Sequence, residues 1–104
     1  MSKYTNVVRF VVKKGCEKAF EDHFDEMVNW DGLLHRVVAK TGGSSYVSYG
    51  LWESEDSMVK ARPKMINLLD GARHLLEEIS PDLGLTDPVS GPVVNEYNRN
   101  DKII

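Results

Sequence analysis

The side chains that could carry chemistry are few and lie on different predicted elements. Asn6 interrupts an apolar strand face, where a buried amide would need several hydrogen-bond partners or a ligand; exposure at a sheet edge is the alternative. His35 alternates with apolar residues along a second strand, and His74 lies near the end of a helix. We expect Asn6, His35 or His74 to hydrogen-bond a developing oxyanion or to remove a proton. A satisfied hydrogen bond in a structural position is the alternative for each histidine.

Three aromatic residues on one predicted strand could form the walls of a pocket. Tyr46, Tyr49 and Trp52 combine apolar rings with polar tips, which suits a binding site for a flat organic molecule. We expect these three residues to bind the substrate. The alternative is that they fill the core, as aromatic residues in strands commonly do.

Sequence motifs that identify common enzyme classes are absent from the chain. It contains no glycine-rich phosphate loop, no nucleophile elbow, no pair of histidines one helical turn apart and no CxxC pair. Cys16 is the only cysteine, so an intrachain disulfide cannot form and a thiolate metal cluster within one chain is excluded. These observations predict no metal site and fit a reducing compartment.

Length and charge narrow the class of protein. A chain of 104 residues with 41% hydrophobic content fits a single domain over 1–104. The net charge of -3 comes from 13 basic and 16 acidic residues that are interspersed, so no nucleic-acid or membrane partner is expected. The apolar runs are far shorter than the roughly 20 residues of a membrane span, and the N-terminus lacks the apolar stretch of a signal peptide. We therefore expect a cytoplasmic protein.

Four segments have the composition of β-strands. Runs rich in β-branched and aromatic residues predict strands at 4–12, 33–41 and 45–53, and the two adjacent glycines predict a hairpin turn at 41–44. A polar connection containing prolines and a glycine then leads to a last predicted strand at about 93–98.

Two segments have helical periodicity. Apolar residues recur at helical spacing over 16–30, and again after Ser54, which can cap a helix. The second helix is expected to extend to about residue 79, with a kink or break at Pro63. Residues 98–104 are expected to form a mobile tail or an arm onto a partner.

The resulting order, β-α-β-β-α-β, predicts the ferredoxin-like α+β fold, a four-stranded antiparallel sheet with two helices on one face. The other face would then expose Val7, Val11, Leu34 and Val38 to water. A second copy of the chain is the simplest cover, so a homodimer is expected.

Three segments resemble a known family: residues 8–15, the Gly32-Leu33-Leu34 start of the second strand, and the run from Tyr46 to Ser54, which reads Tyr-Val-Ser-Tyr-Gly-Leu-Trp-Glu-Ser and leads into an acidic helix start. They resemble the antibiotic biosynthesis monooxygenase domain family of the dimeric α/β-barrel superfamily. The resemblance covers nearly the whole chain, and the strand ending in Trp-Glu-Ser is its most specific part.

The resemblance implies two ferredoxin-like domains whose sheets face each other as a barrel, with a ligand cavity in each subunit between the sheet and the helices. Members of the family include oxygenases that need no metal or flavin, which implies no cofactor here. Others degrade haem with an asparagine on the first strand, a tryptophan in the second helix and a histidine further along it. Asn6 and His74 fall near the first and third of these, but residues 61–63 contain no tryptophan. Many relatives also carry a histidine after Trp-Glu-Ser, and residues 58–64 contain none.

The leading hypothesis is a cofactor-independent monooxygenase that acts on a small electron-rich aromatic or quinol-type molecule. Trp52 and Tyr49 would then enclose the ring, while Asn6, His35 or His74 would act on the developing oxyanion. A non-catalytic dimeric module that binds a small molecule is the alternative, and the missing helix histidine favours it. Haem binding or haem degradation is a third hypothesis.

Overall fold

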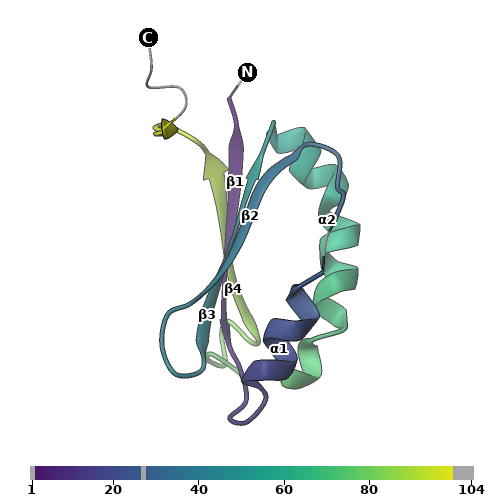
Figure 1. The fold of residues 1–104 in the computed structure, drawn as a ribbon, viewed down its shortest axis with the longest axis vertical. Coiled ribbons are helices and arrows are strands. Elements are labelled where there is room, and N and C mark those ends of the chain that lie inside the picture. The colour runs from purple at the N-terminus through teal and green to yellow at the C-terminus, as the bar shows by residue number, and fades with distance from the viewer. Residues whose placement is uncertain (1, 27, 100–104) are drawn as a thin grey trace.

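The structure is a computed structural model that describes residues 2–26 and 28–99 of the chain. Its elements in chain order are β1 (Tyr4–Val11), α1 (Glu17–Phe24), β2 (Leu33–Lys40), β3 (Ser45–Trp52), α2 (Glu55–Asp70), the short 3-10 helix η1 (Arg73–Leu75) and β4 (Thr86–Pro92). The strands form one antiparallel sheet in the order β2-β3-β1-β4, and both helices cover the same face of it (Figure 1). The predicted ferredoxin-like α+β fold is confirmed.

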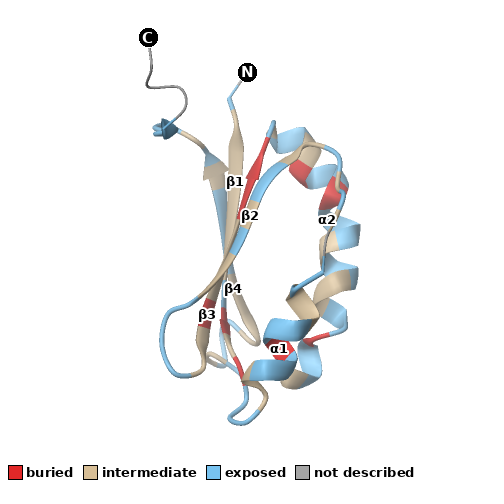
Figure 2. Cartoon of the chain, in the orientation of Figure 1, coloured by how far each residue is buried: buried red, intermediate tan, exposed pale blue. Residues whose placement is uncertain are grey.

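The core lies between the sheet and the helices, and it is divided into two clusters (Figure 2). Successive residues of a strand point to opposite faces, so the apolar residues at alternate positions of β1 and β3 meet the helices. The larger cluster lies under α1 and consists of Phe10, Val12, Phe20, Tyr46 and Leu76. The smaller cluster lies at the other end of β3, under the start of α2, and consists of Trp52, Met58 and Ala61.

β2 contains an irregularity that reverses its predicted faces. Its pairing with β3 shifts between Leu33 and His35, so Leu34 is an extra residue in the ladder. Beyond it, Arg36 and Val38 face the helices, and Val38 packs against the larger cluster. The prediction that Val38 lies on the open face, the side of the sheet away from the helices, is therefore wrong. Val37 lies there instead, paired with Tyr49.

α1 ends earlier than the sequence predicts. Its last turn closes with the amide of Asp25 on the carbonyl of Asp22, at 3.3 Å. Arg36 Nη2 then donates to the carbonyls of Phe24 and Glu26, at 3.0 and 2.9 Å, so a side chain of β2 takes over the bonds that a longer helix would need. The prediction of a helix to residue 30 is wrong for this reason; Met27 lies outside the described residues.

α2 begins where predicted and ends earlier. Ser54 Oγ accepts a hydrogen bond from the amide of Ser57 at 3.1 Å, which confirms the predicted cap. The helix continues through Pro63, although this proline removes the amide that would bond to the carbonyl of Val59; both residues are exposed. Beyond Asp70, η1 and a bridge between Val12 and Leu76 replace the predicted final turns.

β4 corrects the prediction of a last strand at 93–98. It occupies Thr86–Pro92, the stretch that its prolines and glycine marked as a connection. Among the described strands β4 pairs only with β1, so every second amide points away from the sheet and needs no partner. Pro88 and Pro92 both occupy such positions, whereas the amide of Val93 donates to the carbonyl of Lys3 at 2.9 Å. An edge strand therefore accommodates both prolines.

The segment after β4 lies beside the residues that precede β1, because Lys3 Nζ pairs with Glu96 Oε1 at 2.9 Å. Of the predicted tail, residues 100–104 lie outside the described residues. Among the helices that the structure describes, none has the length and apolar character needed to cross a membrane.

Candidate active site

A cavity of about 540 Å³ lies between the sheet and α2. We call it the α2 cavity. All four strands contribute to its floor and α2 forms its roof, and its volume falls within the range of about 300–1,000 Å³ that is typical of small-molecule sites. Most of its walls are apolar, including Val8, Phe10, Met58, Met65 and Leu69.

Asn6 is held in one orientation in the α2 cavity. Trp52 Nε1 lies 2.7 Å from Asn6 Oδ1. An indole N–H can only donate, so the atom that faces it must be the amide oxygen, and the Nδ2 group is turned towards α2. Among the residues that the structure describes, the Nδ2 group there bonds only to Met65 Sδ, a weak acceptor at 3.8 Å. The amide therefore presents a donor to the cavity that is short of a strong acceptor.

Gly50 makes room for this arrangement. It pairs with Asn6 across β1 and β3, and a Cβ atom at this position would lie 2.6 Å from Asn6 Oδ1 and 3.1 Å from Trp52 Nε1. Either approach is too close for an ordinary contact, so any larger residue would displace the amide or the indole. Trp52 is itself only 1% exposed and stacks on Trp30 with ring centroids 6.3 Å apart. Its main contact with the site is the hydrogen bond to Asn6.

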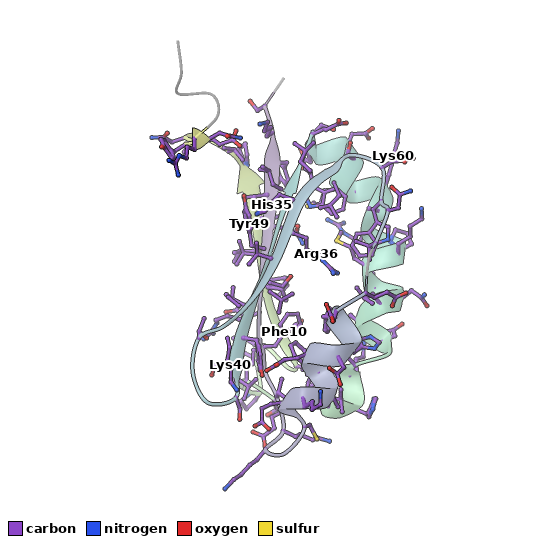
Figure 3. All side chains as sticks on the ribbon, viewed as in Figure 1. Phe10, His35, Arg36, Lys40, Tyr49 and Lys60 are labelled. Atoms are coloured by element: carbon purple, nitrogen blue, oxygen red, sulfur yellow. The ribbon has the colours of Figure 1, made fainter. Side chains whose placement is uncertain are left out.

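The charged residues that line the α2 cavity are Arg36, Arg62 and Arg73. Arg36 projects between the sheet and α2 (Figure 3), while Arg62 and Arg73 are exposed at its edge. Arg73 Nε pairs with Asp70 Oδ1 at 2.7 Å. Ser48, Thr86 and Ser90 add hydroxyl groups. Within the part of the chain that the structure describes, no Asp, Glu or His side chain lines this cavity, so the lining offers hydrogen-bond donors and cations but no strong base.

The predicted site residues are divided between this cavity and other places. Asn6 and Trp52 line it together. His35 and Tyr49 lie on the open face, where their rings make an edge contact with centroids 6.0 Å apart (Figure 3). His74 is exposed on η1. The predicted catalytic roles of His35 and His74 would therefore have to be performed outside the α2 cavity.

Tyr46 lies in the larger core cluster and does not reach the cavity. Its hydroxyl donates to Glu21 Oε2 at 2.5 Å, and Lys40 Nζ lies 5.8 Å from its ring centroid. Burial raises the pKa of Tyr46 to about 12, and the hydrogen bond to the Glu21 carboxylate and the charge of that group act in the same direction. The substrate-binding role predicted for Tyr46 would require a different surface.

Three residues of the site were not identified from the sequence. The predicted register places Arg36 on the open face and so away from the site, although an arginine among apolar strand residues is a recognisable signal. Gly50 in the middle of a strand could have indicated a close approach of another group. Nothing in the sequence distinguishes Met65, because it follows the ordinary apolar period of α2.

Comparison with solved structures gives matches over nearly the whole chain. A mutant form of SnoaB from Streptomyces nogalater, a cofactor-independent oxygenase, has a TM-score of 0.73 at 18% identity, covering 92% of this chain and 97% of its own. A candidate antibiotic biosynthesis monooxygenase from Chloroflexus aurantiacus has a TM-score of 0.72 at 19% identity, covering 93% and 98%. A dimeric ferredoxin-like protein from an uncultured marine organism has a TM-score of 0.70 at 16% identity, covering 95% and 94%.

The fold is that of the antibiotic biosynthesis monooxygenases. At these identities the likeness to antibiotic biosynthesis monooxygenases concerns the fold. No family model and no curated protein sequence matches the chain.

Proposed function

We propose that this protein is a cofactor-independent oxygenase of the antibiotic biosynthesis monooxygenase family, acting in the cytoplasm as a homodimer. Its substrate would be a small electron-rich aromatic molecule bound in the α2 cavity. The observation that carries the proposal is the Asn6 amide, whose oxygen is held by Trp52 so that its N–H groups face an apolar cavity. A donor fixed in this way stabilises negative charge that develops on a bound oxygen atom.

The chemistry requires only the substrate and oxygen. A methylene group activated by neighbouring rings loses a proton, and the resulting anion transfers one electron to O2. The two radicals combine, the peroxide takes up the proton, and loss of water leaves a carbonyl group. One oxygen atom of O2 enters the product and the other leaves as water. The protein has to hold the substrate, stabilise its anion and exclude bulk water.

The lining suggests how the proton leaves. No described carboxylate or imidazole lines the α2 cavity, so a base on the protein is not available there. Asn6 and the arginines instead favour the anionic form of a bound enol or phenol, which lowers its pKa and allows water to take the proton. The substrate would therefore be one that is already acidic in water.

Oxygen uptake with the tricyclic ketone anthrone and with naphthalenediols tests this proposal. We expect Asn6→Leu to lower the enzymatic rate by about 100-fold, the effect of losing one oxyanion donor. Asn67→Leu makes the same change on the exposed side of α2 and should leave the rate unaltered. His35→Ala and His74→Ala test the roles predicted from the sequence. Equal rates in the wild type and the Asn6 variant would contradict the proposal.

The homodimer is supported by the open face of the sheet. Val37, Tyr49, Val7 and Val89 form one row across the four strands on this face, and Val89 is 63% exposed. A patch of this kind is commonly covered by a second copy of the chain. We expect Val7→Lys to produce monomers in sedimentation experiments, whereas Val59→Lys on α2 should not. A wild-type chain that sediments as a monomer at micromolar concentration would contradict this assignment.

A non-catalytic binding module is the second candidate, and the absence of a base from the described cavity lining favours it. It predicts ligand binding that depends on Asn6 without any oxygen uptake. Haem binding would give a Soret band that His74→Ala removes.

A further inference from the structure

We propose that the α2 cavity selects organic anions, flat apolar molecules with one anionic oxygen group, and that Arg36 binds this group. The proposal rests on the proposed small-molecule function and names the class of its ligand. It also assigns a role to a residue that the resemblance to the family did not point to.

Arg36 has the geometry of a preorganised anion-binding group. It projects from β2 into the space beneath α2 (Figure 3), and its Nη2 donates to the carbonyls of Phe24 and Glu26. These bonds fix the plane of the guanidinium. Over residues 2–26 and 28–99, no acceptor bonds its Nε or Nη1 and no carboxylate forms an ion pair with it. The remaining N–H groups are therefore available to a ligand, and a guanidinium binds an oxyanion more strongly than it binds a neutral oxygen.

The charge of the lining is opposite to that of the whole chain. The protein carries a net charge of -3, yet the charged residues around the cavity are Arg36, Arg62 and Arg73, with no described Asp or Glu among them. Asp70 partly compensates Arg73, whereas Arg62 has no ion-pair partner among the described residues. A cavity with walls of low polarity and charges of one sign concentrates ligands of the opposite sign.

The apolar walls decide what kind of anion fits. A small hydrated anion would lose its water against Met58, Met65 and Leu69 without compensation. A ring system would fill this part of the cavity, and its anionic oxygen would reach Arg36 from the same position. The oxygen could belong to a carboxylate or to an acidic phenol or enol, and the chemistry that Arg36 recognises is the same.

Binding measurements under argon, without turnover, test the proposal on the whole chain. The probes are anthracene carboxylate, the neutral anthracene methanol with the same rings, and a hydroxyanthraquinone dye whose colour reports ionisation of its phenol. We expect the wild type to bind the carboxylate about tenfold more tightly than the alcohol, as one charge-assisted hydrogen bond would give. The dye should ionise at lower pH when bound than when free.

Three variants show which residue causes the preference for the carboxylate and the shift of the dye. Arg36→Gln should abolish the preference for the carboxylate and the shift of the dye, and Arg62→Gln should weaken both by a smaller factor. Lys60→Gln removes the same charge from the outer side of α2, where Lys60 points away from the sheet (Figure 3), and should change neither. If Arg36→Gln changes only the binding of the carboxylate, the ligand is a carboxylate. If it changes only the ionisation of the dye, the ligand is a phenol or an enol. Both outcomes support the proposal.

Equal affinity of the wild type for carboxylate and alcohol, together with an unshifted dye, would overturn the proposal. An equal loss in Lys60→Gln would also overturn it, because net charge would then explain the preference. Arg36→Gln removes the bonds to the carbonyls at the end of α1. If that variant does not fold, Arg36→Lys and Arg62→Gln test the proposal, and an unchanged preference for the carboxylate over the alcohol in both variants overturns it. Anion selectivity without oxygen uptake would leave this inference standing while the oxygenase proposal fails, and oxygen uptake without selectivity would do the reverse.

Discussion

Beneath α1 the helix-covered face of the sheet is filled by aromatic rings, whereas beneath α2 the same face is lined by small and polar side chains. Along β3, Tyr46 is buried at the first end, and Ser48 and Gly50 follow at the same face. Along β1, Phe10 is buried near α1, while Asn6 borders the α2 cavity. Side-chain volume therefore decreases from the α1 end to the middle of both strands, and it rises again at Trp52 and Tyr4 in the smaller cluster.

The difference indicates that one end of the sheet stabilises the fold and the other end is suited to binding a ligand. At the α1 end, Phe20 is 0% exposed and packs against Tyr46 with the rings tilted by 44° and their centroids 4.7 Å apart, and the Tyr46 hydroxyl has a carboxylate partner. At the α2 end, the amide of Asn6 has one good partner and the guanidinium of Arg36 has unused donors among the described residues. Unfilled volume and unsatisfied donors lower stability, and they are what a ligand requires.

The largest expected effect comes from emptying the filled end. Phe20→Ala should lower the free energy of unfolding by about 3–5 kcal/mol, because it leaves a void among packed aromatic rings. Phe24→Ala removes the same ring from the same helix at the border of the cavity, where Phe24 is half-buried, and should cost less. Urea denaturation measures both. Equal losses would show that the border of the cavity is packed as tightly as the core beneath α1.

A second prediction concerns the close approach at the α2 end. Gly50→Ala should cost about 1–3 kcal/mol, because its methyl group would have to displace Asn6 Oδ1 or Trp52 Nε1. It should also reduce any activity that depends on the oriented amide. Gly43→Ala is the matched control, since a Cβ there meets nothing within 4 Å, and its effect should stay within about 0.5 kcal/mol. Normal stability and activity in Gly50→Ala would rule out the proposed positioning role.

The polar contact at the filled end should contribute less. Tyr46→Phe removes the bond to Glu21 and should lower the free energy of unfolding by about 1–2 kcal/mol at neutral pH, while anion binding in the α2 cavity remains. Weaker binding of anthracene carboxylate by Tyr46→Phe would show that the two ends are coupled.

The same contact gives the stability a pH dependence. The pKa of Tyr46 is raised from 10.0 to about 12, first by burial and then by Glu21, so the folded protein holds the phenolic proton more tightly than the unfolded chain does. Its contribution is complete below pH 10 and is lost as the pH rises from 10 to 12. In Tyr46→Phe this dependence should disappear. Glu21→Gln should retain part of it, because burial still raises the pKa of Tyr46.

The sequence predicts the features that are determined locally. The strands β1 and β3, the glycine turn and the Ser54 cap each depend on neighbouring residues, and together they are enough to define the order of the fold. The predictions are wrong where a residue distant in the sequence determines the end of a helix or the position of a strand. α1 ends where Arg36 of β2 donates to the carbonyls of Phe24, the last helical residue, and of Glu26 beyond it. β4 accommodates prolines because it lies at the sheet edge.

The candidate site was predictable only for residues that a local sequence pattern marks. Asn6 stands out as an amide on an apolar strand face, and it lies in the cavity together with Trp52. The sequence does not predict that Arg36 lies in the cavity. One extra residue at Leu34 reverses the faces of β2, and no local sequence pattern indicates this bulge. The hydrogen bond between Trp52 and Asn6 joins residues 46 positions apart, so a role of Trp52 in orienting an amide is visible only in the fold.

The smallest expected change in stability comes from filling the empty end. Ser48 pairs with Val8 and Val38 on either side and faces the α2 cavity, so Ser48→Val adds apolar volume between two valines in a residue type that suits strands. We expect the free energy of unfolding to rise by about 0.5–1 kcal/mol, as in other cavity-filling substitutions, while the binding of anthracene carboxylate weakens severalfold. Ser48→Ala removes the hydroxyl without filling the space and separates the two effects. Undiminished binding in Ser48→Val would place the ligand elsewhere, because a side chain that fills the cavity should compete with a ligand that binds in it.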